Sequence, residues 1–398
     1  MTQTIAPVPD VGATRRWAML GASTLAQAAA AVMIHGPAFL IPTLHAQGMS
    51  LARAGVVAAA PTVGVMLTLV AWGWVTDRRG ERFVLVTGLV ATTVAGVAGA
   101  LSGGTTLLVL TLVLAGAAAA STNAASGRVV VGWFPPQRRG LAMGIRQMSQ
   151  PIGVGVAAVS IAVVADTAGV HAALWVPTIA CALAALLVVA VVIDPPRPAE
   201  RSGAVAANPY RRDSYLARIH GVSVLLVAPQ FLVWSFGLVW LVQDRGWEPA
   251  AAGTVVALAQ VAGALGRMAV GHLSDVVGGR MAPLRWVAVA AAASMALLGL
   301  TAALDLAVAV LLVVVATVVT VADNGLAFTA VAERAGPFWS GRALGVQNTA
   351  QFLTGSAVPP LAGLAVAQFG FAATFALGAL LPLLAAPLVP VHRERELS

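Results

Sequence analysis

Long runs of apolar residues fill most of the chain, and short stretches rich in arginine, glycine, proline and aspartate separate them. A helix that spans a membrane needs about 20 mostly apolar residues. The runs are continuous rather than alternating, which disfavours a β-barrel, and backbone polar groups in lipid must be satisfied within each segment. The pattern predicts an all-α membrane protein with twelve spanning helices, at 18–43, 53–75, 83–102, 106–131, 142–165, 172–193, 218–242, 251–273, 284–303, 306–331, 342–366 and 370–390.

The loop arginines predict how these helices are oriented. Eighteen arginines fall in one set of loops, only Arg53 and Arg245 fall in the opposite set, and three lie within predicted spans. Positive residues stay on the cytoplasmic side, where anionic lipid headgroups are their natural neighbours. The first apolar run has no clear cleavage site and is expected to stay in the protein. We therefore expect a multi-pass plasma-membrane protein with both termini in the cytoplasm.

Composition narrows the class of function. Hydrophobic residues make up 59% and charged residues 10% of the chain, which excludes a soluble enzyme and a nucleic-acid-binding domain. All 23 basic residues are arginine, so a phosphate loop and a lysine Schiff base are excluded. One cysteine, Cys181, and no pair of histidines at i and i+4 argue against a metal site. We expect no cofactor, no metal and no enzymatic activity.

The second half of the chain repeats the first. Shifts of 198 and then 201 residues match polar residues that chance would not match in a chain rich in Ala, Val and Gly, for example Asp77 with Asp275 and Asn123 with Asn324. The longest polar stretch lies between the halves. We expect a six-helix bundle over 1–193, a cytoplasmic central loop over 194–217 and a second bundle over 218–398, in pseudo-twofold repeat about the membrane normal.

The loop after the second predicted helix reads Gly73-Trp-Val-Thr-Asp77-Arg78-Arg79-Gly80-Glu81-Arg82-Phe-Val-Leu85. It resembles the loop 2–3 signature of the major facilitator superfamily, roughly G-x-L-a-D-R-x-G-R-R-x-x-L, and a weaker copy begins at Gly271. The resemblance implies two six-helix bundles, a bacterial secondary transporter that works by alternating access, and a monomer. Glu81 stands where the family usually has a basic residue.

The motif has a physical rationale as a conformational latch. Gly73 lets a neighbouring helix approach closely, and Gly80 permits a tight reversal. Asp77 can face the positive N-terminus of a helix in the opposite half. The alternative is plain solvation of a loop. The candidate latch residues are Gly73, Asp77, Arg78, Gly80, Arg82, Gly271, Asp275, Gly278 and Arg280.

Polar residues inside the spans are candidates for substrate contact, because a polar stripe facing lipid is costly. Arg146 could clamp a carboxylate or phosphate in two-pronged fashion, or could form structural hydrogen bonds between the halves. Packing is the alternative for His35 and Trp234, whereas a structural ion pair is the favoured interpretation of Arg128 and of Arg267. The substrate-binding candidates are His35, Asn123, Arg146, Gln147, Gln150, Gln230, Trp234, Asn324, Gln347, Asn348 and Gln351.

Asp323 is the acidic residue within a predicted span, and it is the candidate for binding and releasing a proton. Three intramembrane arginines against this one acid favour a small organic anion, carried with protons as the coupling ion. The alternative within the same class is proton-driven efflux of amphiphilic drugs or metabolites. Replacing Arg146 with alanine would discriminate them, abolishing anion transport but only weakening hydrophobic export. An intramembrane enzyme or a sensor is the alternative of a different class, without support from any catalytic constellation.

Overall fold

The computed structural model describes residues 11–40, 43–44, 47–49, 51–195, 208–247 and 249–394. Within these residues the regular structure is helical. The first half consists of α1 (Ala13–His35), η1 (Gly36–Leu40), α3 (Leu51–Arg79), α4 (Glu81–Ala100), α5 (Thr105–Trp133), α6 (Pro136–Gln147), α7 (Ser149–Ala168), α8 (Val170–Ala173) and α9 (Trp175–Val191). The second half consists of η2 (Pro209–Arg211), α10 (Tyr215–Gln243), α11 (Pro249–Val277), α12 (Met281–Ala303), α13 (Val308–Thr320), α14 (Asp323–Ala335), α15 (Ser340–Gly378), α16 (Leu380–Leu388) and η3 (Val391–Arg393).

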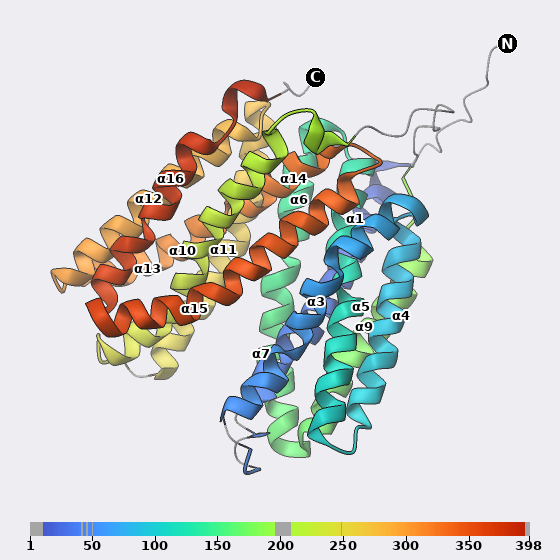
Figure 1. Ribbon diagram of the computed structural model, residues 1–398, viewed down its shortest axis with the longest axis horizontal. Helices are drawn as coiled ribbons and strands as arrows, with labels where there is room; N and C mark the ends of the chain where they lie inside the picture. Colours follow the sequence, from blue (N-terminus) through green and yellow to red (C-terminus); the bar gives the residue numbers. More distant parts are fainter. Residues whose placement is uncertain are drawn as a thin grey trace.

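The helices form two bundles that meet at one end and diverge at the other (Figure 1). Helices α1 to α9 form one bundle and α10 to α16 form the other, and both described termini, the start of α1 and the end of α16, lie at the end where the bundles meet. The principal contacts between the bundles are α3 with α15 and α11 with α6. The predicted central loop, 194–217, lies partly outside the described residues, because 196–207 are not among them.

Eleven helical segments of the described chain are long and apolar enough to cross a membrane. The predicted eleventh and twelfth helices are joined by continuous hydrogen bonding in α15, but the chain turns between them at Gly370, which has φ 78° and ψ 172°. Only a residue without a Cβ adopts this conformation readily. The observed helices are therefore consistent with the twelve that the hydrophobic pattern predicts.

Several predicted helices are interrupted, the twelfth for example at Ala379 between α15 and α16, and two of the interruptions matter for the site. The fifth span divides into α6 and α7 at Met148, and the tenth divides into α13 and α14 at residues 321–322. In the first case Pro151 cannot donate a backbone hydrogen bond to the carbonyl of Gln147, four residues earlier, so the helical ladder is incomplete there. Both interruptions occur beside predicted site residues, Gln147 and Asp323, and they leave backbone groups available to side chains.

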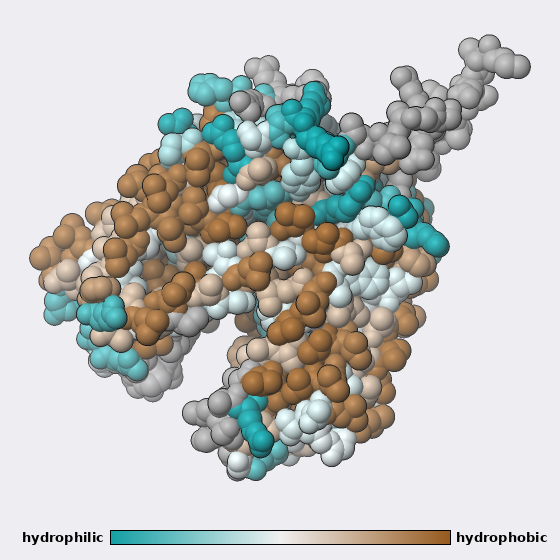
Figure 2. All heavy atoms as spheres, in the orientation of Figure 1, coloured by the Kyte–Doolittle hydropathy of each residue, from teal (hydrophilic) through white to brown (hydrophobic). Residues whose placement is uncertain are grey.

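Small residues let the helices of each bundle pack closely. A Cβ added at Gly64 or at Gly116 would lie 1.9 Å from a backbone carbonyl oxygen of the facing helix, so α3 and α5 are in backbone contact. Such contacts are typical of helix packing in membranes, where close approach replaces the hydrophobic effect. Large apolar side chains cover the flanks of both bundles, while hydrophilic residues gather at the end that carries the termini (Figure 2).

Candidate functional site

Asp77 joins the two bundles at the end where they meet. Its carboxylate accepts hydrogen bonds from the backbone N–H groups of Gly341 (2.9 Å) and Arg342 (3.1 Å), in the first turn of α15, and from Nε of Arg342 (2.8 Å). The residue is buried. A carboxylate at a helix N-terminus satisfies orphan backbone donors and interacts favourably with the helix dipole. We call the contacts of Asp77 and Asp275 with the opposite bundle the gate.

Arg128 lies behind Asp77 in the same bundle. One of its terminal nitrogens donates to Asp77 at 2.7 Å, and its Nε lies 2.7 Å from Glu81. All three side chains are almost fully buried. Glu81, the departure from the family signature, thus forms an ion pair with Arg128. This places Arg128 in a structural network and away from the central cavity.

The second copy of the motif repeats this arrangement. Asp275 accepts hydrogen bonds from the backbone N–H groups of Gly140 and Leu141, both at 2.9 Å, in α6 of the opposite bundle. Arg280 forms an ion pair with Asp275 at 2.5 Å and donates to the carbonyl of Pro136 at 2.6 Å. The sequence repeat is therefore also a repeat of contacts, since each aspartate accepts hydrogen bonds from two backbone N–H groups in the first two turns of a helix of the opposite bundle.

Glycines bring the backbones together at both copies. A Cβ added at Gly73 would lie 2.3 Å from the carbonyl oxygen of Gly341, and one added at Gly271 would lie 2.3 Å from that of Gly140. Gly80 and Gly278 have φ of 99° and 76°, and both reverse the chain into the next helix. These four glycines fit the roles that the motif predicts for them.

The remaining two predicted latch residues stay within their own bundle. Arg78 is exposed, and its guanidinium lies 4.0 Å from the centre of the Trp74 ring. The backbone N–H of Arg82 donates to Asp194 at 2.7 Å, and its side chain donates to the carbonyl of Val189 at 2.8 Å. Arg82 therefore fastens the start of α4 to the end of α9.

Replacing Gly73 with valine is expected to weaken the closed gate. The new side chain would overlap the backbone at Gly341, so α3 and α15 must separate, at a cost of about 1–3 kcal/mol, or about 5- to 150-fold in the gate equilibrium. The measurement is the labelling rate of a cysteine introduced by Ala343→Cys, a buried position, after Cys181→Ser. Gly155→Val, where the added side chain meets open space, is the control. Equal labelling rates in both variants would contradict the prediction.

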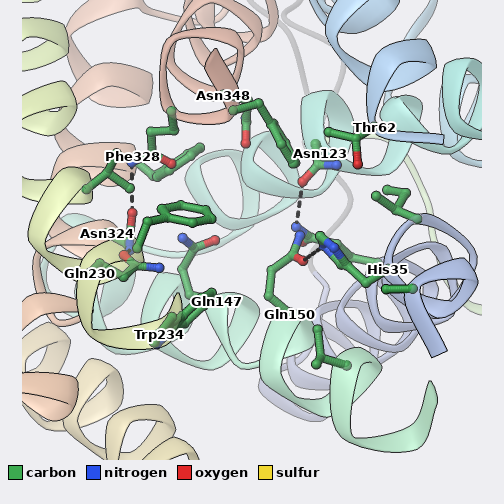
Figure 3. A pocket seen from close by; sticks show the side chains of 18 of the residues that line it. His35, Thr62, Asn123, Gln147, Gln150, Gln230, Trp234, Asn324, Phe328 and Asn348 are labelled. Atoms are coloured by element: carbon green, nitrogen blue, oxygen red, sulfur yellow. Dashed lines mark hydrogen bonds between the residues drawn. The ribbon is translucent and has the colours of Figure 1, made fainter. Parts of the chain in front are cut away.

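A cavity of about 400 Å³ lies between the bundles. The space-filling view shows a notch between the two lobes on the side away from the termini (Figure 2). Both bundles line the cavity, with Asn123, His35 and Gln150 on one side and Asn324, Gln230 and Trp234 on the other (Figure 3). Nine of the predicted substrate-binding residues are among the lining residues: His35, Asn123, Gln147, Gln150, Gln230, Trp234, Asn324, Asn348 and Gln351.

Matching amide pairs stand on the two sides of the cavity. Gln27 donates to Asn123 at 3.0 Å in the first bundle, and Asn324 donates to Gln230 at 3.0 Å in the second. Gln351 extends the second pair, donating to Asn324 at 2.8 Å. Each pair joins the first and fourth spanning helices of its half. The repeat thus places equivalent hydrogen-bonding groups about the pseudo-twofold axis.

Arg146 and Gln347 do not line the cavity. Arg146 is fully buried behind the wall, where it donates to Ser126 (2.9 Å), to the side chain of Gln147 (2.5 Å) and to the carbonyl of Asn123 (3.0 Å). No carboxylate in the described part of the chain lies within ion-pair distance of it. Gln347 instead bonds to His220 at 2.5 Å. The chain repeat pairs Arg146 with Gln347, so at this position the first bundle carries a charge and the second carries a neutral amide.

Arg267 does line the cavity, although the sequence favoured a structural ion pair for it. Its terminal nitrogen donates to the carbonyl of Gln147 at 2.8 Å, the carbonyl that Pro151 leaves unbonded. The sequence also did not single out Thr62 or the aromatic residues Phe39, Phe231, Phe328 and Phe352. One feature of the sequence could have indicated where Arg267 lies, namely Pro151, four residues after Gln147. No feature indicated the aromatic lining residues, because apolar residues in a membrane helix resemble packing residues.

Asp323 lies beside this group, outside the cavity lining. It begins α14, is 1% exposed, and its carboxylate is paired with no side-chain donor among the described residues. Arg267 is the neighbouring cation that attracts it, although the two do not reach ion-pair distance. An isolated buried carboxylate is unfavourable as an anion. The arrangement therefore supports the prediction that Asp323 exchanges protons.

If the ligand is an anion, replacing Arg146 with glutamine, the residue at the equivalent position of the second half, is expected to weaken its binding about tenfold. A charge buried one layer behind the ligand contributes about 1–2 kcal/mol at an effective dielectric constant near 20. The dissociation constant for an anion should rise, while that for a neutral compound should not. Arg146→Lys keeps the positive charge but loses the several hydrogen-bond donors of the guanidinium group. This variant therefore separates the electrostatic effect of Arg146 from its effect on the position of its neighbours. Unchanged anion affinity in Arg146→Gln would contradict the prediction.

Comparisons with known proteins agree with this architecture. The model of the Major Facilitator Superfamily matches residues 21–359. An uncharacterized MFS-type transporter of Mycobacterium tuberculosis is 45% identical over 384 residues, which cover 96% of this chain and 86% of that protein. A glycerol-3-phosphate transporter of Bacillus subtilis is 25% identical over 181 residues, 44% of this chain and 40% of that protein.

Solved structures share the fold. The structure of a proton:xylose symporter bound to 6-bromo-6-deoxy-D-glucose is similar with a TM-score of 0.75 at 17% identity, covering 95% of each chain. The family and the helical fold that the sequence motif predicts are thus confirmed. Because the family model matches most of the chain and a relative is 45% identical over 96% of it, the chain belongs to the major facilitator superfamily.

Proposed function

We propose that this multi-pass transporter is a secondary active carrier of a small organic anion, coupled to protons and working by alternating access. The observation that carries the proposal is Arg267, a cation in the lining of a cavity whose described lining contains no acidic residue. A guanidinium in a site of low dielectric binds a carboxylate or phosphate strongly. Arg146, buried behind the wall, adds to the positive potential.

The gate supports alternating access. The bundles are joined by Asp77 and Asp275 at the end that carries the termini, while the cavity opens toward the notch at the other end. Breaking the gate and closing the notch would expose the same cavity to the opposite side. Since the loop arginines favour cytoplasmic termini, this conformation corresponds to an outward-open state in the plasma membrane.

One relative's name is consistent with an anionic cargo. The Bacillus subtilis protein that matches 44% of this chain is a glycerol-3-phosphate transporter. Efflux of amphiphilic drugs or metabolites is the second candidate, and the aromatic residues of the lining favour it. The charge of the transported solute separates the two functions.

The test is transport by the purified protein in proteoliposomes, with and without an imposed pH gradient. We expect a panel of organic anions to contain compounds that raise the melting temperature of the protein in detergent and that accumulate when the proton gradient is inward. A matched panel of neutral amides and organic cations is the control. Stabilisation and transport of cationic or neutral amphiphiles, with none of the anions, would replace the anion proposal by the efflux candidate.

A further inference from the structure

The charges around the cavity sum to one positive charge when Asp323 is ionised and to two when it is protonated. Arg146 and Arg267 are the two buried cations at this level, and Asp323 is the buried acid beside them. His35 is the other titratable residue of the described lining, and its Nε2 lies 3.1 Å from the side-chain oxygen of Gln150. The net charge is positive in both protonation states and attracts an anion, and Arg267 is the one arginine of the described lining that can contact an anionic group.

Arg267 retains unused donors. One terminal nitrogen donates to the backbone of Gln147, but the buried Nε has no partner among the described residues. The side chain is only 3% exposed. A buried N–H group without a partner is costly, and the edge formed by Nε and the second terminal nitrogen matches two carboxylate oxygens. The unpaired Nε therefore points to a planar, two-oxygen ligand group.

The rest of the wall is poorly suited to a sugar. Most of the amides use their groups on one another, as in the pairs of Gln27 with Asn123 and Gln230 with Asn324. Between the polar groups lie the aromatic rings of Phe39, Phe231, Trp234, Phe328 and Phe352. The rings of Phe231 and Trp234 are 5.6 Å apart, as in a packed aromatic cluster. A polyhydroxylated ligand would place hydroxyl groups against the apolar surface of the lining, which is unfavourable. An apolar ligand would bury that surface, which is favourable.

We propose that the cavity binds a monocarboxylate with a compact apolar, preferably aromatic, body. The carboxylate sits on the free edge of Arg267, and the body lies among Phe231, Trp234 and Phe328. The volume of about 400 Å³ is at the lower end of the range for ligand cavities. This assignment rests on the proposed anion transport and names the class of anion.

The test compares five ligands that differ in one property at a time. Phenylacetate is the aromatic monocarboxylate, phenylacetamide its neutral counterpart, phthalate a dianion, glycerol 3-phosphate a phosphate ester, and xylose a neutral sugar. Affinity is measured by tryptophan fluorescence and thermal shift with the purified full chain. We expect phenylacetate to bind at least about tenfold more tightly than each of the others, because charge-assisted hydrogen bonds contribute about 1.5–3 kcal/mol.

Substitutions of lining residues test which side chains contact the ligand. Arg267→Gln is expected to weaken phenylacetate binding about 10- to 100-fold, and Arg267→Lys, which keeps the charge without the fork, to weaken it less. Trp234→Leu should weaken phenylacetate more than acetate. Arg245→Gln, in a loop far from the cavity, is the control. If Arg267→Gln does not fold, the Lys and Leu variants still test the assignment.

The possible failures are distinguishable. If phthalate or glycerol 3-phosphate binds more tightly than phenylacetate and depends on Arg267, the monocarboxylate assignment is wrong while anion transport stands. If no anion binds and phenylacetamide does, the proposed function itself is wrong. If phenylacetate binds equally well to wild type and to both Arg267 variants, the carboxylate is not held by Arg267 and the proposal is overturned.

Discussion

Replacing Asp323 with asparagine is expected to abolish proton-driven accumulation of substrate while preserving or increasing affinity for an anion. Asp323 is buried, and its carboxylate has no side-chain donor among the described residues. Its neighbouring cation, Arg267, is also the proposed anion-binding group. A substrate anion that binds Arg267 would neutralise it, and the carboxylate would then be favoured in its protonated form. Asparagine removes the proton site and the competing negative charge together.

The pH dependence has a definite sign. In the wild type, a proton on Asp323 would remove the negative charge that competes with the substrate anion for Arg267, so anion affinity should rise as pH falls. The asparagine variant should show flat, high affinity, increased about fivefold at an effective dielectric constant near 20. The helices packed against α14 contribute the other buried titratable or charged groups that could alter this profile, namely Arg128, Arg146, Tyr215, His220 and Arg267.

Proteoliposomes provide the measurement. Exchange of labelled for unlabelled anion should persist in Asp323→Asn, whereas accumulation driven by an inward proton gradient should fall at least about tenfold, to the level set by equilibration. Asp166→Asn, an exposed acid on α7, is the matched control. Undiminished proton-driven accumulation by a correctly inserted Asp323→Asn protein would exclude Asp323 as the proton site.

Replacing Asp77 with asparagine is expected to cut transport about 10- to 100-fold without a comparable loss of ligand binding. The substitution removes the charge that faces the first turn of α15, Arg342 and Arg128. Breaking a buried pair by removing one partner costs about 3–5 kcal/mol, although Glu81 keeps part of the compensation for Arg128. The equilibrium therefore shifts away from the closed gate, and one state of the cycle becomes too rarely populated.

Binding and conformation should be measured separately for this variant. We expect the dissociation constant of an anion to change less than fivefold or so, since Asp77 lies at the gate and outside the cavity lining. Distances between spin labels on α3 and α15 should lengthen. Asp275→Asn is the informative comparison, because it breaks the equivalent contact with α6. Normal transport with unchanged label distances would show that the Asp77 contact does not control the gate.

Asp77 and Asp323 are expected to act in different steps of the proposed transport cycle. Asp77 belongs to a contact made only where the bundles meet, and Asp323 belongs to the interior beside the cavity. A gate defect should change rates while leaving the pH dependence of binding intact. A defect at Asp323 should change the pH dependence of binding while leaving the rates of gate opening intact. Measuring both properties in both variants therefore tests whether proton binding and gate opening are separable steps.

The membrane fold, the repeat and most of the polar residues of the cavity lining followed from the amino-acid sequence alone. Apolar runs of spanning length can only be helices in lipid, and buried polar side chains must face a cavity or another helix. For this reason Asn123, Gln150, Asn324 and Gln351 could be selected before any contact was known. The matched motifs around Asp77 and Asp275 likewise indicated equivalent positions in two related bundles.

Which arginine faces the cavity became clear only from the packing of the helices. Arg146 and Arg267 are alike in sequence as charges within apolar helices, and the sequence favoured Arg146 for substrate contact. The structure buries Arg146 against Ser126 and Asn123, and brings Arg267 from the other bundle to the carbonyl that Pro151 leaves free. The sequence likewise did not predict the aromatic residues of the cavity lining. Which side of a helix meets a cavity depends on how two bundles pack, and that long-range geometry is not encoded in the local hydrophobic pattern.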